Sequence, residues 1–129
     1  MRLLVDANAL IWAVDQPSDL GADAIAALND PAIQLLLSAA TIWEISIKVG
    51  LKKLVLTSTF RDWIDQAVRD LGLSVLPITA DYASAQIALP LHHRDPFDRL
   101  LVAQAQVEKI AIVSSDAVFD QYGITRIWA

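Results

Sequence analysis

Residues 34–50 read QLLLSAATIWEISIKVG, and this segment indicates the class of fold. It opens with a short leucine run without polar interruption, a pattern typical of a strand that is buried on both faces. Ser38 follows with a hydroxyl that can cap the next segment, and residues 39–49 predict a helix that Gly50 ends. A buried strand that runs directly into a helix is typical of α/β proteins.

The same alternation recurs along the chain. Further strands are predicted at residues 2–5, 74–76, 111–113 and 126–128. Helices are predicted at residues 9–14, 22–28, 60–71, 80–88 and 96–107, with a helical turn at 117–119. We therefore predict one α/β domain over residues 1–129, in which a central, mostly parallel sheet is flanked by helices in three layers.

The composition narrows the class of protein. Hydrophobic residues make up 55% of the chain, which is ample for a buried core. No apolar stretch reaches the roughly 18 residues that a membrane helix needs, and the apolar segment after Arg2 is too short for a signal peptide. The chain has no cysteine, which excludes disulfides, thiolate catalysis and cysteine-bound zinc. We expect a soluble, cytoplasmic protein without a membrane partner.

Four acids stand beside the predicted ends of strands or within the helices that follow: Asp6, Glu44, Asp98 and Asp116. Asp6 and Asp116 come just after two of the strands, which is where ligands bind in parallel α/β folds. If the four carboxylates gather, they form a site of hard oxygen donors that suits Mg²⁺ or Mn²⁺. These ions promote the hydrolysis of phosphate esters.

Each acid also has an ordinary structural explanation. Asp6 and Asp116 can cap the helical segments that follow them. Glu44 can form an ion pair with Lys48, which lies one helical turn further along. Asp98 falls in the first turn of a predicted helix, where a negative charge is favourable. The residues by themselves leave both explanations open.

The net charge of −5 does not exclude a polyanionic substrate. The chain has 15 acids and 10 bases, so without the four candidate ligands 11 acids face 10 bases, a balance of −1. Bound divalent ions would offset much of the remaining repulsion. The lack of a basic excess argues against tight, non-specific binding of nucleic acid.

Basic residues near the four acids in the sequence are candidates for contacts to phosphate. They are Lys48, Lys52, Lys53, Arg94 and Arg99, and a solvated face explains Lys52 and Lys53 equally well.

Histidine and tryptophan residues have simpler interpretations. His92 and His93 are adjacent in a predicted loop, and adjacent side chains seldom bind one ion well, so we interpret them as surface residues. The tryptophans are interpreted as core or interface anchors rather than platforms for stacked bases. These are Trp12, Trp43, Trp63 and Trp128.

Several segments resemble PIN-domain ribonucleases of the VapC type, the toxins of bacterial type II toxin–antitoxin pairs. The matching segments are LLVD at residues 3–6, SAATIWEISIK at 38–48, LPLHHRDPFDRLL at 89–101 and VSSD at 113–116. Tyr122-Gly123, before the last strand, also matches. The resemblance covers almost the entire chain, and its most specific part is residues 90–101.

The resemblance implies a PIN-like nuclease domain that hydrolyses RNA with Mg²⁺ or Mn²⁺. The acids of the family fall on Asp6, Glu44, Asp98 and Asp116, with Asp6 and Asp98 as anchors of the main ion. The metal would activate a water molecule and steady the leaving oxygen. The resemblance also implies a cognate antitoxin protein and a homodimer.

The chain departs from the resembled pattern at two positions. Ala7 stands where the family often has a hydroxyl residue after the first acid. Ser114 stands where related sequences often have Thr, and it keeps the hydroxyl. Ser114 therefore joins Arg99, Arg94 and Lys48 as a possible contact to the phosphates of RNA.

Two alternatives remain beside the nuclease. A phosphoacceptor receiver domain is a signalling module of similar build that also binds Mg²⁺, but it needs an acceptor Asp after a central strand, and residues 34–37 are followed by Ser38. A PIN-like scaffold that binds a partner without cleavage would not need all four acids. A metal-dependent RNA cleavage assay separates the three possibilities.

Overall fold

The computed structural model describes residues 1–92 and 94–129. His93 lies outside the described residues, so the interpretation of the histidine pair can be followed only at His92, which is exposed.

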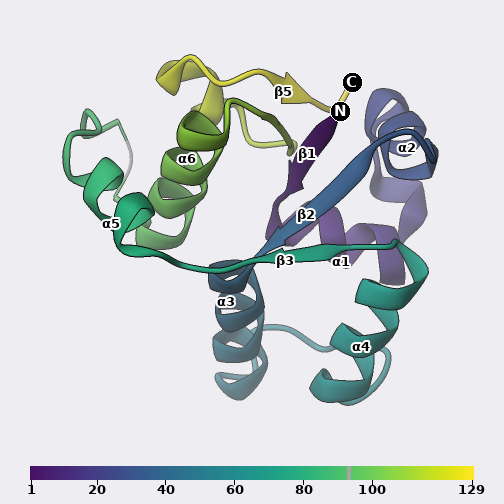
Figure 1. Cartoon of the computed structure of the whole chain (residues 1–129). Coiled ribbons are helices and arrows are strands. Elements are labelled where there is room, and N and C mark those ends of the chain that lie inside the picture. Colours follow the sequence, from purple (N-terminus) through teal and green to yellow (C-terminus); the bar gives the residue numbers. More distant parts are fainter. Residues whose placement is uncertain (93) are drawn as a thin grey trace.

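Within this part of the chain, five strands form one sheet in which every neighbouring pair is parallel. The strands lie in the order β3-β2-β1-β4-β5 (Figure 1). They are β1 (Arg2–Val5), β2 (Gln34–Ser38), β3 (Ser74–Leu76), β4 (Ala111–Val113) and β5 (Arg126–Ile127). The predicted α/β fold with its parallel sheet is confirmed.

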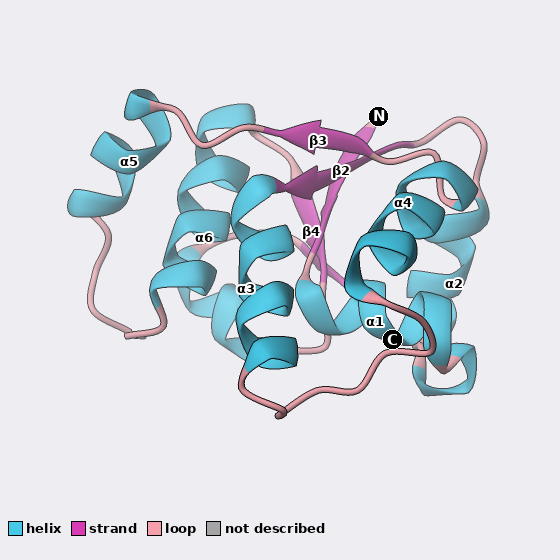
Figure 2. Cartoon of the chain, turned by 90° about the horizontal axis from the view of Figure 1, so that it is seen from below, coloured by secondary structure: helices cyan, strands magenta, loops and turns pink. Residues whose placement is uncertain are grey.

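Helices cover both faces of the sheet (Figure 1). The α-helices are α1 (Ala7–Asp15), α2 (Ala22–Asn29), α3 (Ala39–Gly50), α4 (Phe60–Asp70), α5 (Ala80–Ile87) and α6 (Pro96–Glu108). Two short 3₁₀ segments are η1 (Pro17–Asp19) and η2 (Ala117–Tyr122). Figure 2 shows α5 outside α6, farther from the sheet, and α3 between α6 and the group of α1 and α4. No helix of the described chain is both long enough and apolar enough to cross a membrane.

The alternation of side chains in the central strands produces two apolar clusters. Leu3 and Val5 of β1 pack in the cluster that includes residues of α1, α2 and α4. Leu4, between them, packs in the other cluster together with Leu101 of α6 and Phe119 of η2. Because β1 is buried on both faces, its sequence is a continuous apolar run rather than an alternation of apolar and polar residues.

The carboxyl ends of three strands meet at one edge of the sheet. Val5 at the end of β1 is in register with Leu37 of β2 on one side and with Val113 of β4 on the other. Asp6, Ser38 and Ser114 each follow at the next position. The parallel pairing therefore places these three residues, which are far apart in the sequence, side by side at the carboxyl edge of the sheet.

The strand order also distinguishes this fold from a receiver domain. Receiver-type sheets have the order 2-1-3-4-5, whereas here β1 is central and β2 and β4 flank it. The central strand is thus followed by Asp6 and not by Ser38, which corrects the assumption that residues 34–37 form the central strand.

The end of α3 differs from the prediction in one respect. Gly50 is the last helical residue, and the left-handed conformation that closes the helix falls on Lys52, with φ of 58°. The N–H groups of Lys52 and Lys53 donate to the carbonyls of Val49 and Lys48 at 3.0 and 2.9 Å. This pattern is the one that usually places Gly at the left-handed position. After α4, in contrast, a glycine takes this conformation: Gly72 has φ of 62°.

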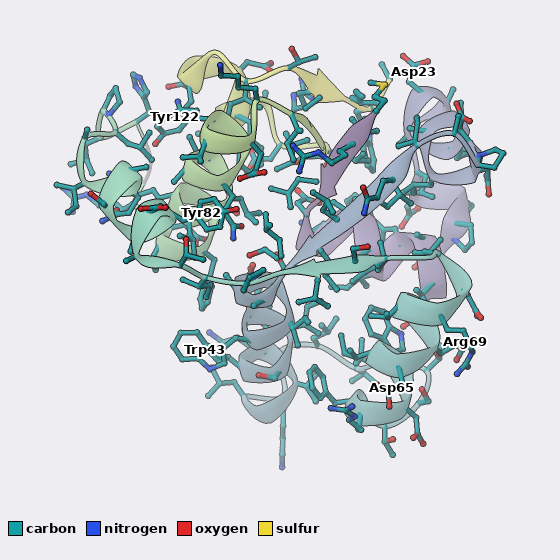
Figure 3. The ribbon with its side chains drawn as sticks, viewed as in Figure 1. Asp23, Trp43, Asp65, Arg69, Tyr82 and Tyr122 are labelled. Carbon is teal, nitrogen blue, oxygen red and sulfur yellow. The ribbon has the colours of Figure 1, made fainter. Side chains whose placement is uncertain are left out.

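The tryptophans do not all lie in the core. Trp63 is fully buried, and the rings of Trp12 and Trp128 pack with centroids 5.6 Å apart. Trp43 projects from α3 (Figure 3) and is 61% exposed. Its ring lies edge-on to that of Phe97, at 5.6 Å between centroids.

Candidate active site

All four predicted acids line one cavity of about 140 Å³ at the carboxyl edge of the sheet. The lining residues are Asp6, Ala7, Asn8, Glu44, Lys48, Asp95, Asp98 and Asp116. The acids come from four segments: the end of β1, the middle of α3, the first turn of α6 and the loop after β4. Parallel strands direct their carboxyl ends to the same edge, which is why residues so distant in sequence share one cavity.

Asp6 is one of two buried acids that line the cavity, with 7% of its surface exposed. It is the N-cap of α1, and its Oδ1 accepts a hydrogen bond of 2.9 Å from the N–H of Ala9. The helix accordingly begins at Ala7, two residues earlier than predicted. The ordinary explanation of Asp6 as a cap is therefore correct, and the residue lines the cavity as well.

Burial raises the pKa of the Asp6 carboxyl to about 6. The negative charges of Glu44 and Asp116 act in the same direction, while hydrogen bonds from the Ser114 hydroxyl and the Ala9 amide oppose the rise. A positive ion in the cavity would favour the ionised carboxylate and so reverse this effect.

Ser114 connects two of the acids. Its hydroxyl is hydrogen-bonded to the Asp6 side chain, and its Oγ accepts a hydrogen bond of 3.0 Å from the N–H of Asp116. Asp116 in turn caps η2, since its Oδ1 accepts from the N–H of Val118 at 3.0 Å. The side chain of Asp6 and the backbone N–H of Asp116 are thus held by one shared neighbour.

Glu44 is 7% exposed and lies in an ion pair with Lys48, at 2.9 Å between Oε2 and Nζ. The predicted i,i+4 pair is therefore present, and both of its members line the cavity. Lys48 supplies a cation among five carboxylates. It offsets part of their mutual repulsion.

Asp95 is the N-cap of α6, and Asp98 lies in its first turn. Oδ1 of Asp95 accepts hydrogen bonds from the N–H groups of Phe97 and Asp98, at 2.9 and 3.3 Å. The side chain of Asp98 lies one turn into the helix and lines the cavity. The start of α6 is thus capped without the carboxylate of Asp98.

The donor set fits a hard divalent cation in kind, because it consists of carboxylates and one side-chain amide. The described side chains do not, however, contain three acids or histidines close enough together to surround one ion directly. Mg²⁺ usually keeps several waters and binds one or two carboxylates, so a site of this kind would contact its outer acids through water.

Comparison with known proteins identifies the family. Residues 3–124 match the family model of the PIN domain. The chain belongs to the PIN-domain family.

Solved structures share the fold of this PIN domain at low sequence identity. A chain of VapBC2 from Rickettsia felis, solved bound to a DNA fragment from its promoter, matches with a TM-score of 0.77 and 14% identity over 100% of both chains. FitAcB from Neisseria gonorrhoeae matches with a TM-score of 0.64 and 17% identity, over 96% of this chain and 95% of that one. VapBC-1 from nontypeable Haemophilus influenzae matches with a TM-score of 0.65 and 14% identity, over 98% of this chain and 96% of that one. A search of curated proteins found no match.

Two of the predicted phosphate contacts have structural roles in this PIN domain. Ser114 is fully buried, so its hydroxyl orients the acids and does not face a substrate. The guanidinium of Arg99 donates to the carbonyls of Pro90, Gln86 and Leu89, at 3.0, 3.2 and 3.3 Å. Arg99 thereby fastens the end of α5 to α6. The full burial of Ser114 corrects its predicted contact to phosphate, whereas a contact of Arg99 to phosphate stays a prediction.

Two polar residues that line the cavity, Asn8 and Asp95, were not predicted as site residues. Asn8 lies two positions after Asp6, in the first turn of α1, and this spacing was the available signal. For Asp95 no local signal was available, since its place in the cavity depends on how α6 meets α3.

Proposed function

We propose that this PIN domain is an endoribonuclease that hydrolyses RNA phosphodiester bonds with Mg²⁺ or Mn²⁺. The observation that supports the proposal is the shared cavity of Asp6, Glu44, Asp98 and Asp116 at the carboxyl edge of a parallel sheet. A scaffold without catalysis would not need this set of carboxylates, whose mutual repulsion lowers stability when no cation is bound.

In this proposal Asp6 and Asp98 hold the main ion, and Glu44 and Asp116 complete the site directly or through water. When bound, the ion supplies an activated water and stabilises charge on the phosphoryl group and the leaving oxygen. The Ser114 hydroxyl keeps Asp6 oriented toward the ion. Lys48 lies within the cavity, where its ammonium group can attract the phosphate of the substrate.

We further propose that the protein is the toxin of a type II pair, acting in the cytoplasm as a homodimer and silenced by a cognate antitoxin protein. The support comes from structures of similar fold, which include VapBC2, FitAcB and a toxin–antitoxin complex from Klebsiella pneumoniae. Exposed apolar side chains such as Ile25, Val75 and Ile87 offer surface for protein partners.

The catalytic proposal is tested with Asp98→Asn. Because Asp95 caps α6, the substitution should leave the fold intact and remove one ligand charge. RNA cleavage by the purified variant with Mn²⁺ should fall by about 100-fold or more. Asp65→Asn, on the exposed face of α4 (Figure 3), is the matched control and should cleave at the wild-type rate. Wild-type cleavage by Asp98→Asn, or cleavage in EDTA, would contradict the proposal.

The partner proposal is tested separately. Light scattering should give the mass of two chains, and the antitoxin encoded beside the gene should copurify with the protein and block RNA cleavage. A strict monomer that recovers no partner contradicts this part and leaves the catalytic proposal standing.

A further inference from the structure

A second pocket, of about 500 Å³, opens beside the acidic cavity. Three residues line both spaces: Glu44, Lys48 and Asp95. The rest of the second pocket comes from the end of α3, the turn that follows it and the segment that leads into α6: Ile47, Leu51, Lys53, Arg94, Pro96 and Phe97. A molecule bound to the acids could therefore extend into this pocket without leaving the surface.

The walls of the second pocket combine an apolar surface with a basic rim. Ile47, Leu51, Pro96 and Phe97 supply carbon surface, and the edge-on contact with Trp43 steadies the ring of Phe97. The rim is basic: three bases, Lys48, Lys53 and Arg94, face two acids, Glu44 and Asp95. The local balance is thus +1 in a chain whose net charge is −5.

The pocket is built from segments whose backbones are fixed. The turn after α3 is closed by the hydrogen bonds of Lys52 and Lys53 to the last turn of the helix, and this sets the position of Lys53. On the opposite wall, the Asp95 cap holds the N–H of Phe97 at 2.9 Å. A pocket formed before the ligand arrives loses less conformational entropy on binding.

We propose that this pocket holds a nucleobase of the RNA strand adjacent to the scissile phosphate, with Lys53 and Arg94 on the next phosphate. The inference rests on the proposed ribonuclease function. An apolar slot lined by an aromatic ring suits the face of any base, and cations beside it suit the backbone. The basic rim and the continuity with the acidic cavity favour RNA over an apolar peptide as the occupant.

The structure separates two lysines that the sequence could not tell apart. Lys53 lines the pocket, whereas Lys52 does not, although both are exposed neighbours in one turn. Leu51, which lines the pocket and is 60% exposed, has a similar counterpart in Val55, which is 88% exposed and lies outside it. The chain therefore offers a matched control for each test substitution.

The test measures binding of fluorescein-labelled hexauridylate by anisotropy with Mg²⁺, in an Asp98→Asn background that suppresses cleavage. Leu51→Glu should weaken binding about tenfold or more, because it places a negative charge against the base and backbone. Lys53→Ala should weaken binding by about threefold to tenfold and reduce the salt slope by about one. Val55→Glu and Lys52→Ala should stay within about twofold of the parent.

A set of hexauridylates, each with one abasic position, identifies the base in the pocket. One position should weaken binding in the parent, and the loss of that base should cost nothing further in Leu51→Glu, since the two changes remove the same contact. Equal affinities for Leu51→Glu and Val55→Glu, or additive losses at every position, would overturn the inference. If the otherwise wild-type enzyme still cleaves RNA in that case, the proposed function stands without this pocket. If it neither binds nor cleaves RNA, both fail.

Discussion

Asp6 ends the central strand and begins the first helix, so a single side chain serves the fold and the cavity. Its carboxylate accepts from the Ala9 amide and the Ser114 hydroxyl, yet burial still raises its pKa to about 6. A carboxyl group whose pKa is higher in the folded than in the unfolded chain binds more protons when folded. Between pH 4 and pH 6 stability therefore falls as pH rises.

We predict that Asp6→Asn flattens the pH dependence of stability in this window. In EDTA, the wild-type free energy of unfolding should fall by up to about 1.4 kcal/mol per pH unit between pH 4 and pH 6 because of this one group. Glu108 and Asp120, whose pKa values are lowered by their hydrogen-bond partners Tyr82 and Arg126, act in the opposite direction and mainly below this window. Urea titrations at several pH values measure the slope. If the free energy of unfolding changes with pH equally in wild type and Asp6→Asn, the raised pKa of Asp6 is contradicted.

Two glycines predict opposite outcomes for the same substitution. A Cβ at Gly21 would clash with the carbonyl oxygen of Trp128, whereas a Cβ at Gly50 meets nothing within 4 Å. Gly21→Ala should lower the free energy of unfolding by about 2 kcal/mol or more, since the terminal backbone must move. Gly50→Ala should raise it by up to about 1 kcal/mol because helical Gly is entropically costly. Thermal unfolding of both variants checks the pair, and a neutral Gly21→Ala would show that the end of the chain yields freely.

At the scale of elements, a polar triad fastens α5, which lies outside the main layers. Oε2 of Glu108 accepts from the hydroxyl of Tyr82 at 2.8 Å, and Oε1 accepts from Arg2 at 3.0 Å. The triad joins α5, the end of α6 and the start of β1. Figure 3 shows Tyr82 on α5 in front of α6. The triad at one end of α5 and Arg99 at the other end hold this helix against α6 by polar contacts.

Removal of one hydroxyl should loosen α5 in particular. Tyr82→Phe keeps the ring, which is 7% exposed, and removes the hydrogen bond to Glu108. We expect a loss of about 1 kcal/mol, with faster amide hydrogen exchange in α5 than in wild type and little change in α1. The pKa of Glu108 should also rise toward its usual value, because the Tyr82 hydrogen bond is the main cause of its lowering. Uniform exchange changes across the chain would indicate a global effect instead.

For the whole molecule, the gathered carboxylates predict a stability that depends on divalent ions. An ion that binds only the folded chain should stabilise it by about 2.7 kcal/mol at a hundredfold excess over its dissociation constant. The melting temperature should rise with Mn²⁺ and fall with EDTA, and Asp98→Asn should respond less than the Asp65→Asn control. If millimolar metal leaves the melting temperature of every variant unchanged, these acids do not form one ion site.

The sequence predicted the elements well where the local signal was strong. The leucine strand predicted at residues 34–37 and the helix predicted at residues 60–71 are found as β2 and α4. Local prediction failed where a tertiary contact decided the outcome. The last strand stops at Ile127, one residue early, since the Trp128 carbonyl turns to accept from the N–H of Ala24 at 3.1 Å.

The candidate site was also predicted only in part from the sequence. The resemblance in sequence selected Asp6, Glu44, Asp98 and Asp116, whereas their burial, spacing and neighbours depend on the register of three parallel strands. Three findings required the folded chain. Asp95 lines the cavity, the Ser114 hydroxyl is hydrogen-bonded to Asp6, and Arg99 donates to a carbonyl at the end of α5.

The class of fold, the family resemblance and the four candidate acids could be derived from the sequence alone, because periodicity, caps and motifs are encoded locally. The tertiary structure decided which strand is central, which lysine of the turn after α3 lines the second pocket, and that this pocket adjoins the acids. The physical reason is that cavities form between elements distant in sequence, and their shape follows from packing rather than from any local pattern of residues.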